Sequence, residues 1–237
     1  MINFLQKMSS ILTALLLSAC ANQQIKAGDT PSSEAGRTID IQVMPYYSAY
    51  HGKVERINVH RELDPLLITN RLPDYQKAVN IAGESAQLMT PMTMFVLAAR
   101  SYDFGLRDEA VKWFYRGQNR LITALYVLDL PKRSIAEYTG FSQLVGRFIN
   151  SYAFCNLLNQ RKLAEEAIEW TKAHPYQAIF LAEILSKHKD RKKALKEAEA
   201  VLDKRLAEQD AYFSNQQNKR KFEIQRQENQ VTELFCR

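Results

Sequence analysis

The fold is set mainly by one stretch, residues 90–125, which reads TPMTMFVLAARSYDFGLRDEAVKWFYRGQNRLITAL. Thr90 followed by Pro91 predicts a helix start, because a capping hydroxyl precedes a ring that suits the first helical position. Gly105 predicts where this first helix ends. The carboxylates of the pair Asp108-Glu109 suit the positive N-terminal end of a second helix. Two helices joined by so short a connection predict an αα-hairpin.

Part of this hairpin resembles one unit of a Sel1 or tetratricopeptide repeat. The similar residues are Tyr102 and Gly105 at the end of the first helix, followed by Glu109-Ala110 and the aromatic pair Trp113-Phe114 on the second. Small residues let the two helices approach closely, while the aromatic rings fill the groove between neighbouring hairpins. The resemblance implies stacked hairpins whose grooves suit peptides or helices.

A related pattern lies downstream, where Glu166-Ala167-Ile168-Glu169-Trp170 matches Glu109-Ala110-Val111-Lys112-Trp113. The two are offset by 57 residues, which is not a multiple of the period of about 34 residues that tetratricopeptide repeats have. A weaker match is Lys193-Ala194-Leu195. The sequence therefore predicts a helical bundle, or a short irregular array of hairpins, instead of a regular solenoid.

The remainder of the chain after Glu62 is also predicted to be helical. Periodic apolar positions and helix-end signals predict helices over residues 73–88, 132–158, 161–174 and 176–187. The segment from Asp190 to about Gln230 has no Pro or Gly and is rich in good helix formers, which predicts one long amphipathic C-terminal helix. The predicted fold class is mainly α, with a single domain over residues 37–237.

A small extended element is predicted ahead of the helices. Residues 39–43 alternate strictly between apolar and polar side chains, and residues 53–59 form a second extended piece. Between them Pro45 and Gly52 bound a predicted turn that holds three tyrosines. The two pieces can pair as a β-hairpin, with the tyrosines either pinning the segment to the core or offering a stacking surface.

The first twenty residues resemble the start of a bacterial lipoprotein precursor. Lys7 precedes the apolar run Ile11–Leu17, which is too short to span a bilayer and is typical of a signal peptide. The following Leu17-Ser18-Ala19-Cys20 resembles a lipobox. The resemblance implies cleavage between Ala19 and Cys20, acylation of Cys20, and residues 1–19 as the signal peptide. The alternatives are an ordinary cleaved signal peptide and a buried N-terminal helix.

Residues 20–36 are predicted to be a flexible tether, because they carry many turn formers and no apolar periodicity. Ala21 follows the cysteine, and in enteric lipoproteins the absence of Asp there favours export to the outer membrane. The resemblance implies a lipid-anchored protein at the inner leaflet of the outer membrane, facing the periplasm.

Charge and cysteine content add two expectations. The formal net charge is +6, and removal of Lys7 with the signal peptide lowers it to +5. This balance is mildly basic without a clustered basic face, so nucleic-acid binding is not predicted. In an oxidising compartment Cys155 and Cys236 are candidates for a disulfide, with a free, buried Cys155 as the alternative.

The sequence contains no familiar catalytic or metal-binding pattern. It lacks the H-E-x-x-H, P-loop and dinucleotide-binding motifs, and its four histidines have no metal-ligand spacing: His51, His60, His174 and His188. His174, at a helix end before a proline, is predicted to support the last helix carbonyls. We therefore predict no cofactor, no metal and no enzymatic activity, with a hydrolase of unfamiliar site as the alternative.

These features predict a membrane-anchored, periplasm-facing adaptor or assembly factor that binds a protein of the cell envelope through its helical hairpins. The alternative is an immunity lipoprotein that neutralises a toxic effector in the periplasm, a role that some Sel1-like lipoproteins have. The exposed side of the hairpin over residues 91–125 is predicted to carry the partner-binding surface, with four candidate residues: Arg100, Lys112, Tyr115 and Arg116.

Overall fold

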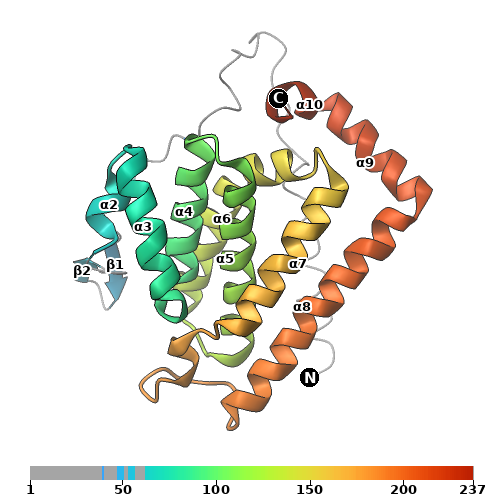
Figure 1. Cartoon of the computed structure of the whole chain (residues 1–237). Coiled ribbons are helices and arrows are strands. Elements are labelled where there is room, and N and C mark those ends of the chain that lie inside the picture. Colours follow the sequence, from blue (N-terminus) through green and yellow to red (C-terminus); the bar gives the residue numbers. More distant parts are fainter. Residues whose placement is uncertain (1–38, 40–46, 51–52, 57–61, 237) are drawn as a thin grey trace.

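The computed structural model describes residue 39 and residues 47–50, 53–56 and 62–236 (Figure 1). The predicted signal peptide, the cleavage site at Ala19-Cys20 and the tether lie outside these residues. Among the described helices, none combines the length and the apolar character that crossing a membrane requires.

Helices dominate the described residues, which confirms the predicted mainly α fold. They follow one another along the chain as α2 (Asp64–Ile68), α3 (Leu72–Glu84), α4 (Pro91–Asp103), α5 (Arg107–Val127), α6 (Lys132–Ala153), α7 (Leu157–Ala173), α8 (Arg191–Ser214), α9 (Gln216–Glu228) and α10 (Val231–Phe235). Two short 3₁₀ turns, η2 (Ala86–Leu88) and η3 (Gln177–Phe180), lie in the connections.

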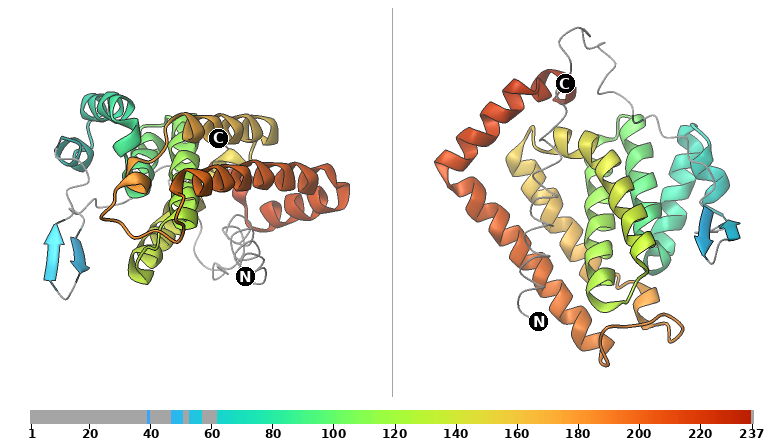
Figure 2. Two further views of the ribbon diagram at one scale, coloured as in Figure 1. Left: turned by 90° about the horizontal axis from the view of Figure 1, so that it is seen from below. Right: turned by 180° about the vertical axis from the view of Figure 1, so that it is seen from behind.

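Helices α3 to α7 form a bundle, and α8 crosses along one side of it (Figures 1 and 2). Helix α5 is central, because it contacts α4, α6, α7 and α8. The larger core cluster includes fully buried rings such as Phe95 of α4 and Phe114 of α5. A smaller cluster at one end of the bundle joins Val127 of α5, Ile179 of η3 and Leu195 of α8.

The predicted αα-hairpin is confirmed as α4 and α5. The Thr90 hydroxyl accepts a hydrogen bond from the Thr93 amide at 3.1 Å, which caps α4. Gly105 has a φ of +76°, a conformation that glycine adopts without steric penalty. The Leu106 amide then donates to the Ser101 carbonyl at 2.9 Å, so the end of α4 is satisfied before α5 begins.

Two glycines let the helices around α5 approach closely. A Cβ atom placed on Gly117 of α5 would lie 2.7 Å from a ring carbon of Phe95, and one on Gly146 of α6 would lie 2.7 Å from a ring carbon of Phe114. Real Cβ atoms do not come this close to carbon, so each glycine makes room for an aromatic ring. The core thus depends on these two positions having no side chain.

One segment that was predicted to be continuous helix is interrupted by asparagine. Asn215 breaks the predicted Asp190–Gln230 helix into α8 and α9, because its side chain accepts from the amides of Gln217 and Asn218 and caps a new helix. The predicted break between the helices over 132–158 and 161–174 is present but lies a few residues earlier, because Asn156 caps α7 in the same way. Asparagine favours caps over helix interiors, a preference that overall helix propensity does not reveal.

The predicted helix over residues 176–187 is wrong. Only η3 is helical there, and an irregular loop follows. The loop is held by Arg191, whose guanidinium donates to the carbonyls of Ile179, Leu181 and Ile184, and by an isolated β-bridge between Leu128 and Ser186. Because these contacts satisfy the backbone hydrogen-bonding groups of the loop, the loop is stable without forming a helix.

The small β-hairpin is present, but its first strand differs from the prediction. Strand β1 (Tyr47–Tyr50) pairs antiparallel with β2 (Lys53–Arg56), with Tyr50 opposite Lys53. The described second strand lies within the predicted extended piece over residues 53–59, of which 57–59 lie outside the described residues, whereas the first strand lies within the predicted tyrosine-rich turn. The two tyrosines of this strand favour extended structure, a preference that the turn prediction did not weigh. Of the predicted strand over residues 39–43, only Ile39 is described.

A disulfide joins Cys155 to Cys236, with the two Cα atoms 5.6 Å apart. It ties the end of α10 back to the end of α6, so that α9 folds back from α8 across the end of the molecule (Figure 2). Buried Arg226 donates to both sulfur atoms at 3.3 Å and to the Ser151 carbonyl at 3.0 Å. The C-terminal helices are therefore fixed to the bundle covalently and by a buried cation.

Gly117→Ala is expected to destabilise the protein by about 1–3 kcal/mol, because the added methyl group overpacks Phe95. The matched control is Gly140→Ala on α6, where an added Cβ meets nothing within 4 Å. That control is expected to gain up to about 1 kcal/mol from better helix propensity. Urea unfolding of both variants measures the difference, and equal stabilities would contradict the close approach of Phe95 to Gly117.

Reduction of the disulfide is expected to lower the free energy of unfolding by about 4 kcal/mol, since the bond closes a loop of 81 residues. The measurement is urea unfolding of the oxidised chain, of the reduced chain, and of the double variant Cys155→Ser, Cys236→Ser. The last two should unfold at the same lower urea concentration. Unfolding of the oxidised chain at that same concentration would show that the two cysteines are not bonded.

Candidate partner-binding site

Two of the four predicted surface residues lie inside the protein. Arg100 is 9% exposed, and its Nε donates to the Leu67 carbonyl at 3.0 Å. Tyr115 is 6% exposed, and its hydroxyl accepts from Gln160 at 3.1 Å. The prediction that they form an exposed surface is wrong, because α4 and α5 have neighbours on several sides instead of forming an outer hairpin.

Lys112 lies at the seam where α5 packs against α7, and it is partly exposed. Its Nζ forms ion pairs with Glu109 at 2.9 Å and with Glu166 at 3.8 Å. The first partner is on the same helix and the second is on α7, so Lys112 bridges the seam. Both charges of each pair remain partly open to water, and such pairs contribute little to stability.

Arg116 lies one turn further along α5, between two tryptophan rings. The centre of its guanidinium is 5.0 Å from the ring centroid of Trp113 and 4.8 Å from that of Trp170 on α7. The two rings meet edge to face, 6.2 Å apart. This arrangement fixes the side chain, and each ring attracts the cation through its quadrupole.

The guanidinium of Arg116 is partly buried, but its hydrogen-bonding capacity is not used. Burial lowers the pKa of Arg116, while the charges of Glu109 and Glu166 raise it. Its Nε is buried without a hydrogen-bond partner, and within the described part of the chain we find no hydrogen bond or ion pair to this side chain. A buried nitrogen without a partner is not peculiar to Arg116, because Nε of Arg120 also lacks one. What distinguishes Arg116 is that no hydrogen bond from its side chain is found among the described residues.

Arg120, the next turn along, shows what a structural arginine looks like in this fold. It is fully buried, and it donates to the carbonyls of Ala86, Met89 and His174 at 2.6–2.7 Å. Its guanidinium also lies 5.1 Å from the Trp170 ring centroid. Burial lowers the pKa of Arg120 to about 10. Its hydrogen bonds join three segments of the chain, which contrasts with the unused donors of Arg116.

His174 helps to position Trp170. The Nδ1 atom of His174 donates to the Trp170 carbonyl at 2.8 Å, and the two rings stack with centroids 4.7 Å apart. This confirms the prediction that His174 supports the end of its helix. Because the His174 carbonyl also accepts from Arg120, the end of α7 is held from both sides.

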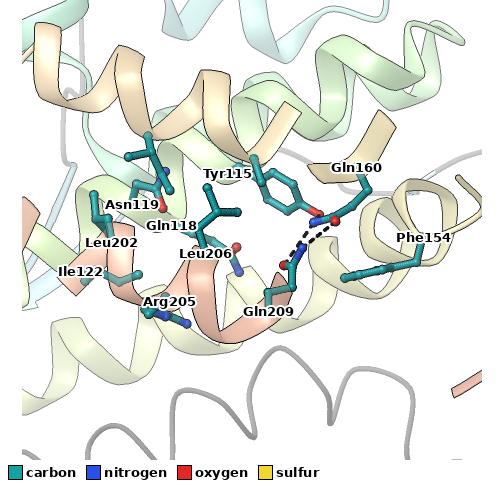
Figure 3. A pocket seen from close by; sticks show the side chains of 12 residues that line it. Tyr115, Gln118, Asn119, Ile122, Phe154, Gln160, Leu202, Arg205, Leu206 and Gln209 are labelled. Carbon is teal, nitrogen blue, oxygen red and sulfur yellow. Dashed lines mark hydrogen bonds between the residues drawn. The ribbon is translucent and has the colours of Figure 1, made fainter. Parts of the chain in front are cut away.

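A small pocket lies on the neighbouring side of α5, where α8 crosses α5 and α7 (Figure 3). Tyr115, Gln160 and Gln209 meet there, with Gln209 donating to Gln160 at 2.8 Å. Burial raises the pKa of Tyr115 above its usual value, so its hydroxyl stays protonated. The cavity volume is about 60 Å³, far below the roughly 300 Å³ at which small-molecule sites begin. The pocket therefore accommodates a few water molecules.

The seam formed by Lys112, Trp113, Arg116, Glu166 and Trp170 is the better candidate site. Within the described residues no group of three or more His, Cys, Asp or Glu side chains is placed to hold a metal ion. What the seam presents is a fixed guanidinium between aromatic faces. Guanidinium groups bind carboxylates through paired hydrogen bonds, so the chemistry of this seam suits an acidic group.

Sequence reasoning identified Lys112 and Arg116 but missed Trp170 as their partner. The signal was present in the repeated pattern, because Glu109 and Trp113 match Glu166 and Trp170. Successive residues of α5 contact successive residues of α7 in the same direction, so the two helices run parallel. The matching residues of the repeated pattern therefore meet at one seam. The sequence shows the pattern as a repeat, but periodicity alone does not tell which helices pack together.

Comparisons with known proteins give one relative. No family model matches the chain, and no solved structure matches it. A protein of Haemophilus influenzae, described as an uncharacterized protein, is 53% identical over 230 residues, which are 97% of this chain and 88% of the relative's length. The resemblance to Sel1 and tetratricopeptide repeats therefore stays a prediction.

Substitution of the two arginines separates their roles. Arg120→Gln is expected to cost about 3 kcal/mol or more, because buried carbonyls lose their donor. Arg116→Gln is expected to change the free energy of unfolding by less than about 1 kcal/mol, since only cation–π contacts are lost and a partly buried charge is removed. Urea unfolding compares the two variants. Equal losses would mean that Arg116 serves the fold, and that its donors have partners in solution.

Proposed function

The chain belongs to one family with the Haemophilus influenzae protein, and we propose that it is a lipid-anchored, periplasm-facing protein that binds an acidic segment of another envelope protein at the α5–α7 seam. In this proposal it acts as an adaptor or assembly factor and not as an enzyme. Residues 1–19 are its signal peptide, and Cys20 carries the lipid.

The observation that carries the proposal is the state of Arg116. Two tryptophan rings hold its guanidinium, and yet its donors have no partner among the described residues. Arg116 contributes little to stability compared with Arg120, which donates three hydrogen bonds to backbone carbonyls. A purely structural role therefore does not account for Arg116. Preorganisation lowers the entropy lost on binding, so a fixed, unsatisfied guanidinium favours recognition of a ligand.

The surroundings of Arg116 favour one class of ligand. Lys112 is already paired with Glu109 and Glu166, which leaves Arg116 as the cation open to an incoming carboxylate. Trp113 is 3% exposed and supports Arg116 from within the core. The partly exposed ring of Trp170 offers apolar contact beside the guanidinium, and Arg and Trp are among the residues most enriched at positions that dominate binding energy at protein interfaces. An Asp or Glu side chain of a partner, flanked by apolar residues, matches both features.

The anchor and the tether support the same proposal. Two or more acyl chains give stable attachment to a membrane, and a flexible tether lets the body search for partners near that membrane. Restriction to one surface raises the effective concentration of a membrane-bound partner. A contact of modest affinity is then sufficient for a lasting complex.

The test is site-specific photo-crosslinking in cells. A photoreactive amino acid replaces Ala173, which is exposed and one turn from Trp170. We expect one dominant protein adduct, and we expect Arg116→Gln to reduce its yield at least tenfold, because loss of a charge-assisted hydrogen bond costs about 1.5–3 kcal/mol. Arg116→Lys keeps the positive charge but loses the paired donors, so its adduct yield should lie between those of the unchanged protein and of Arg116→Gln.

The control places the same photoreactive residue at Leu158, at the other end of α7, where 85% of the side chain is exposed. An adduct at Leu158 as strong as that at Ala173, or an adduct that survives Arg116→Gln, would refute the seam as the binding site. Cys20→Ser tests the anchor, since the adduct should fade when the protein is no longer held at the membrane. A delivered toxin as the captured partner would favour the immunity role.

A further inference from the structure

One end of the bundle exposes a group of large apolar side chains. This end is built by η2, the α5–α6 connection, η3 and the loop that leads to α8 (Figure 1). Its exposed residues are Leu88 (48%), Phe180 (43%), Leu181 (42%) and Leu185 (71%). Since η2 contacts η3, and the Leu185 carbonyl accepts from the Asp129 amide, these segments lie together.

The exposure is not caused by a loose loop. Ile179, the neighbour of Phe180, is fully buried in the second core cluster. Arg191 binds three carbonyls of the loop, and the Ser186 hydroxyl donates to the Val127 carbonyl at 2.9 Å. The structure therefore holds these apolar side chains outward on a well-fixed support, and fixed, exposed apolar groups mark interaction surfaces.

Basic residues are frequent in the loop that carries most of these apolar side chains and at the start of α8. Between residues 180 and 193 the chain has five basic and two acidic residues, a net charge of +3. Lys189, Lys192 and Lys193 are exposed, and in the described part of the chain none of them forms an ion pair. One of the two acids, Asp190, is used as the cap of α8, accepting from the Lys193 amide at 2.9 Å.

We infer that this end of the bundle docks on the surface of an anionic phospholipid bilayer. Phe180, Leu181 and Leu185 would enter the region between headgroups and acyl chains, while the lysines pair with the headgroup phosphates. Interfacial binding elements combine these two features, and each Lys near an anionic surface adds to the attraction. The inference goes beyond the proposed function, because it concerns the folded body and does not depend on acylation of Cys20.

The charge pattern is what favours a lipid surface over a protein. Three lysines without ion-pair partners complement a surface of uniform negative charge, and the apolar side chains protrude from a loop. A bilayer accepts protruding side chains of any shape, whereas a protein partner must present matching hollows. Orientation follows as well: this end faces the membrane, and the end that carries the disulfide faces away.

The test uses the full chain carrying Cys20→Ser, which removes both the acylation site and the free thiol. A single new thiol, Leu185→Cys, carries an environment-sensitive fluorophore, and Leu158→Cys in the same background is the matched control. Each is mixed with vesicles of phosphatidylglycerol and phosphatidylcholine, or with pure phosphatidylcholine. We expect a blue shift at residue 185 on the anionic vesicles, with quenching by lipid-borne quenchers, and neither effect at residue 158.

Charge reversal completes the test. The triple variant Lys189→Glu, Lys192→Glu, Lys193→Glu alters exposed side chains only, so its melting temperature should be unchanged while its affinity for anionic vesicles falls at least tenfold. A label at residue 185 that remains in water on anionic vesicles would overturn the inference. Equal insertion into pure phosphatidylcholine would also overturn it. If residue 185 is shielded in isolated envelopes but not on vesicles, the surface binds a protein and the inference is wrong. None of these outcomes bears on the anchor, because Cys20 is absent.

Discussion

The fold depends on how one buried cation, Arg120, is satisfied. An isolated charge inside a protein is strongly unfavourable, so Arg120 requires acceptors from several directions at once. It finds them in the carbonyls of Ala86, Met89 and His174. The connection between α3 and α4 and the end of α7 are therefore both fixed relative to the middle of α5. Trp170 stands on the turn of α7 that this arrangement holds, so the position of the seam follows from Arg120.

The seam uses the same residue type for the opposite purpose. Arg120 and Arg116 are four residues apart on one helix, and both contact the ring of Trp170. Arg120 donates to three backbone carbonyls, whereas Arg116 makes no hydrogen bond within the described part of the chain. In the proposed function, stability and recognition are separated by a single helical turn. A substitution of Arg116 leaves the three hydrogen bonds of Arg120 to backbone carbonyls in place.

Sequence reasoning was most successful where a structure is encoded locally. The α4–α5 hairpin depends on Thr90, Pro91 and Gly105, whose effects act within a few residues, and it was predicted correctly. The break at Asn215 was missed, and the break at Asn156 was placed a few residues too late, because composition averages over a segment and hides one capping side chain. The predicted helix over residues 176–187 was wrong because Arg191 satisfies the backbone carbonyls of a loop there. A helix-periodicity pattern does not show such a contact. The predicted partner-binding surface was wrong at Arg100 and Tyr115, because the exposure of a side chain depends on which helices pack beside it.

The disulfide has a mechanical consequence. Residues 155–236 form a closed covalent ring that contains α7, α8, α9 and α10. A pulling force that enters through the N-terminal part of the chain passes from Cys155 directly to Cys236 and does not load the backbone between them. About 270 Å of extended chain is withheld from stretching in this way. When a force is applied at the two termini, the helices inside this ring therefore stay outside the stretched path while the disulfide is intact.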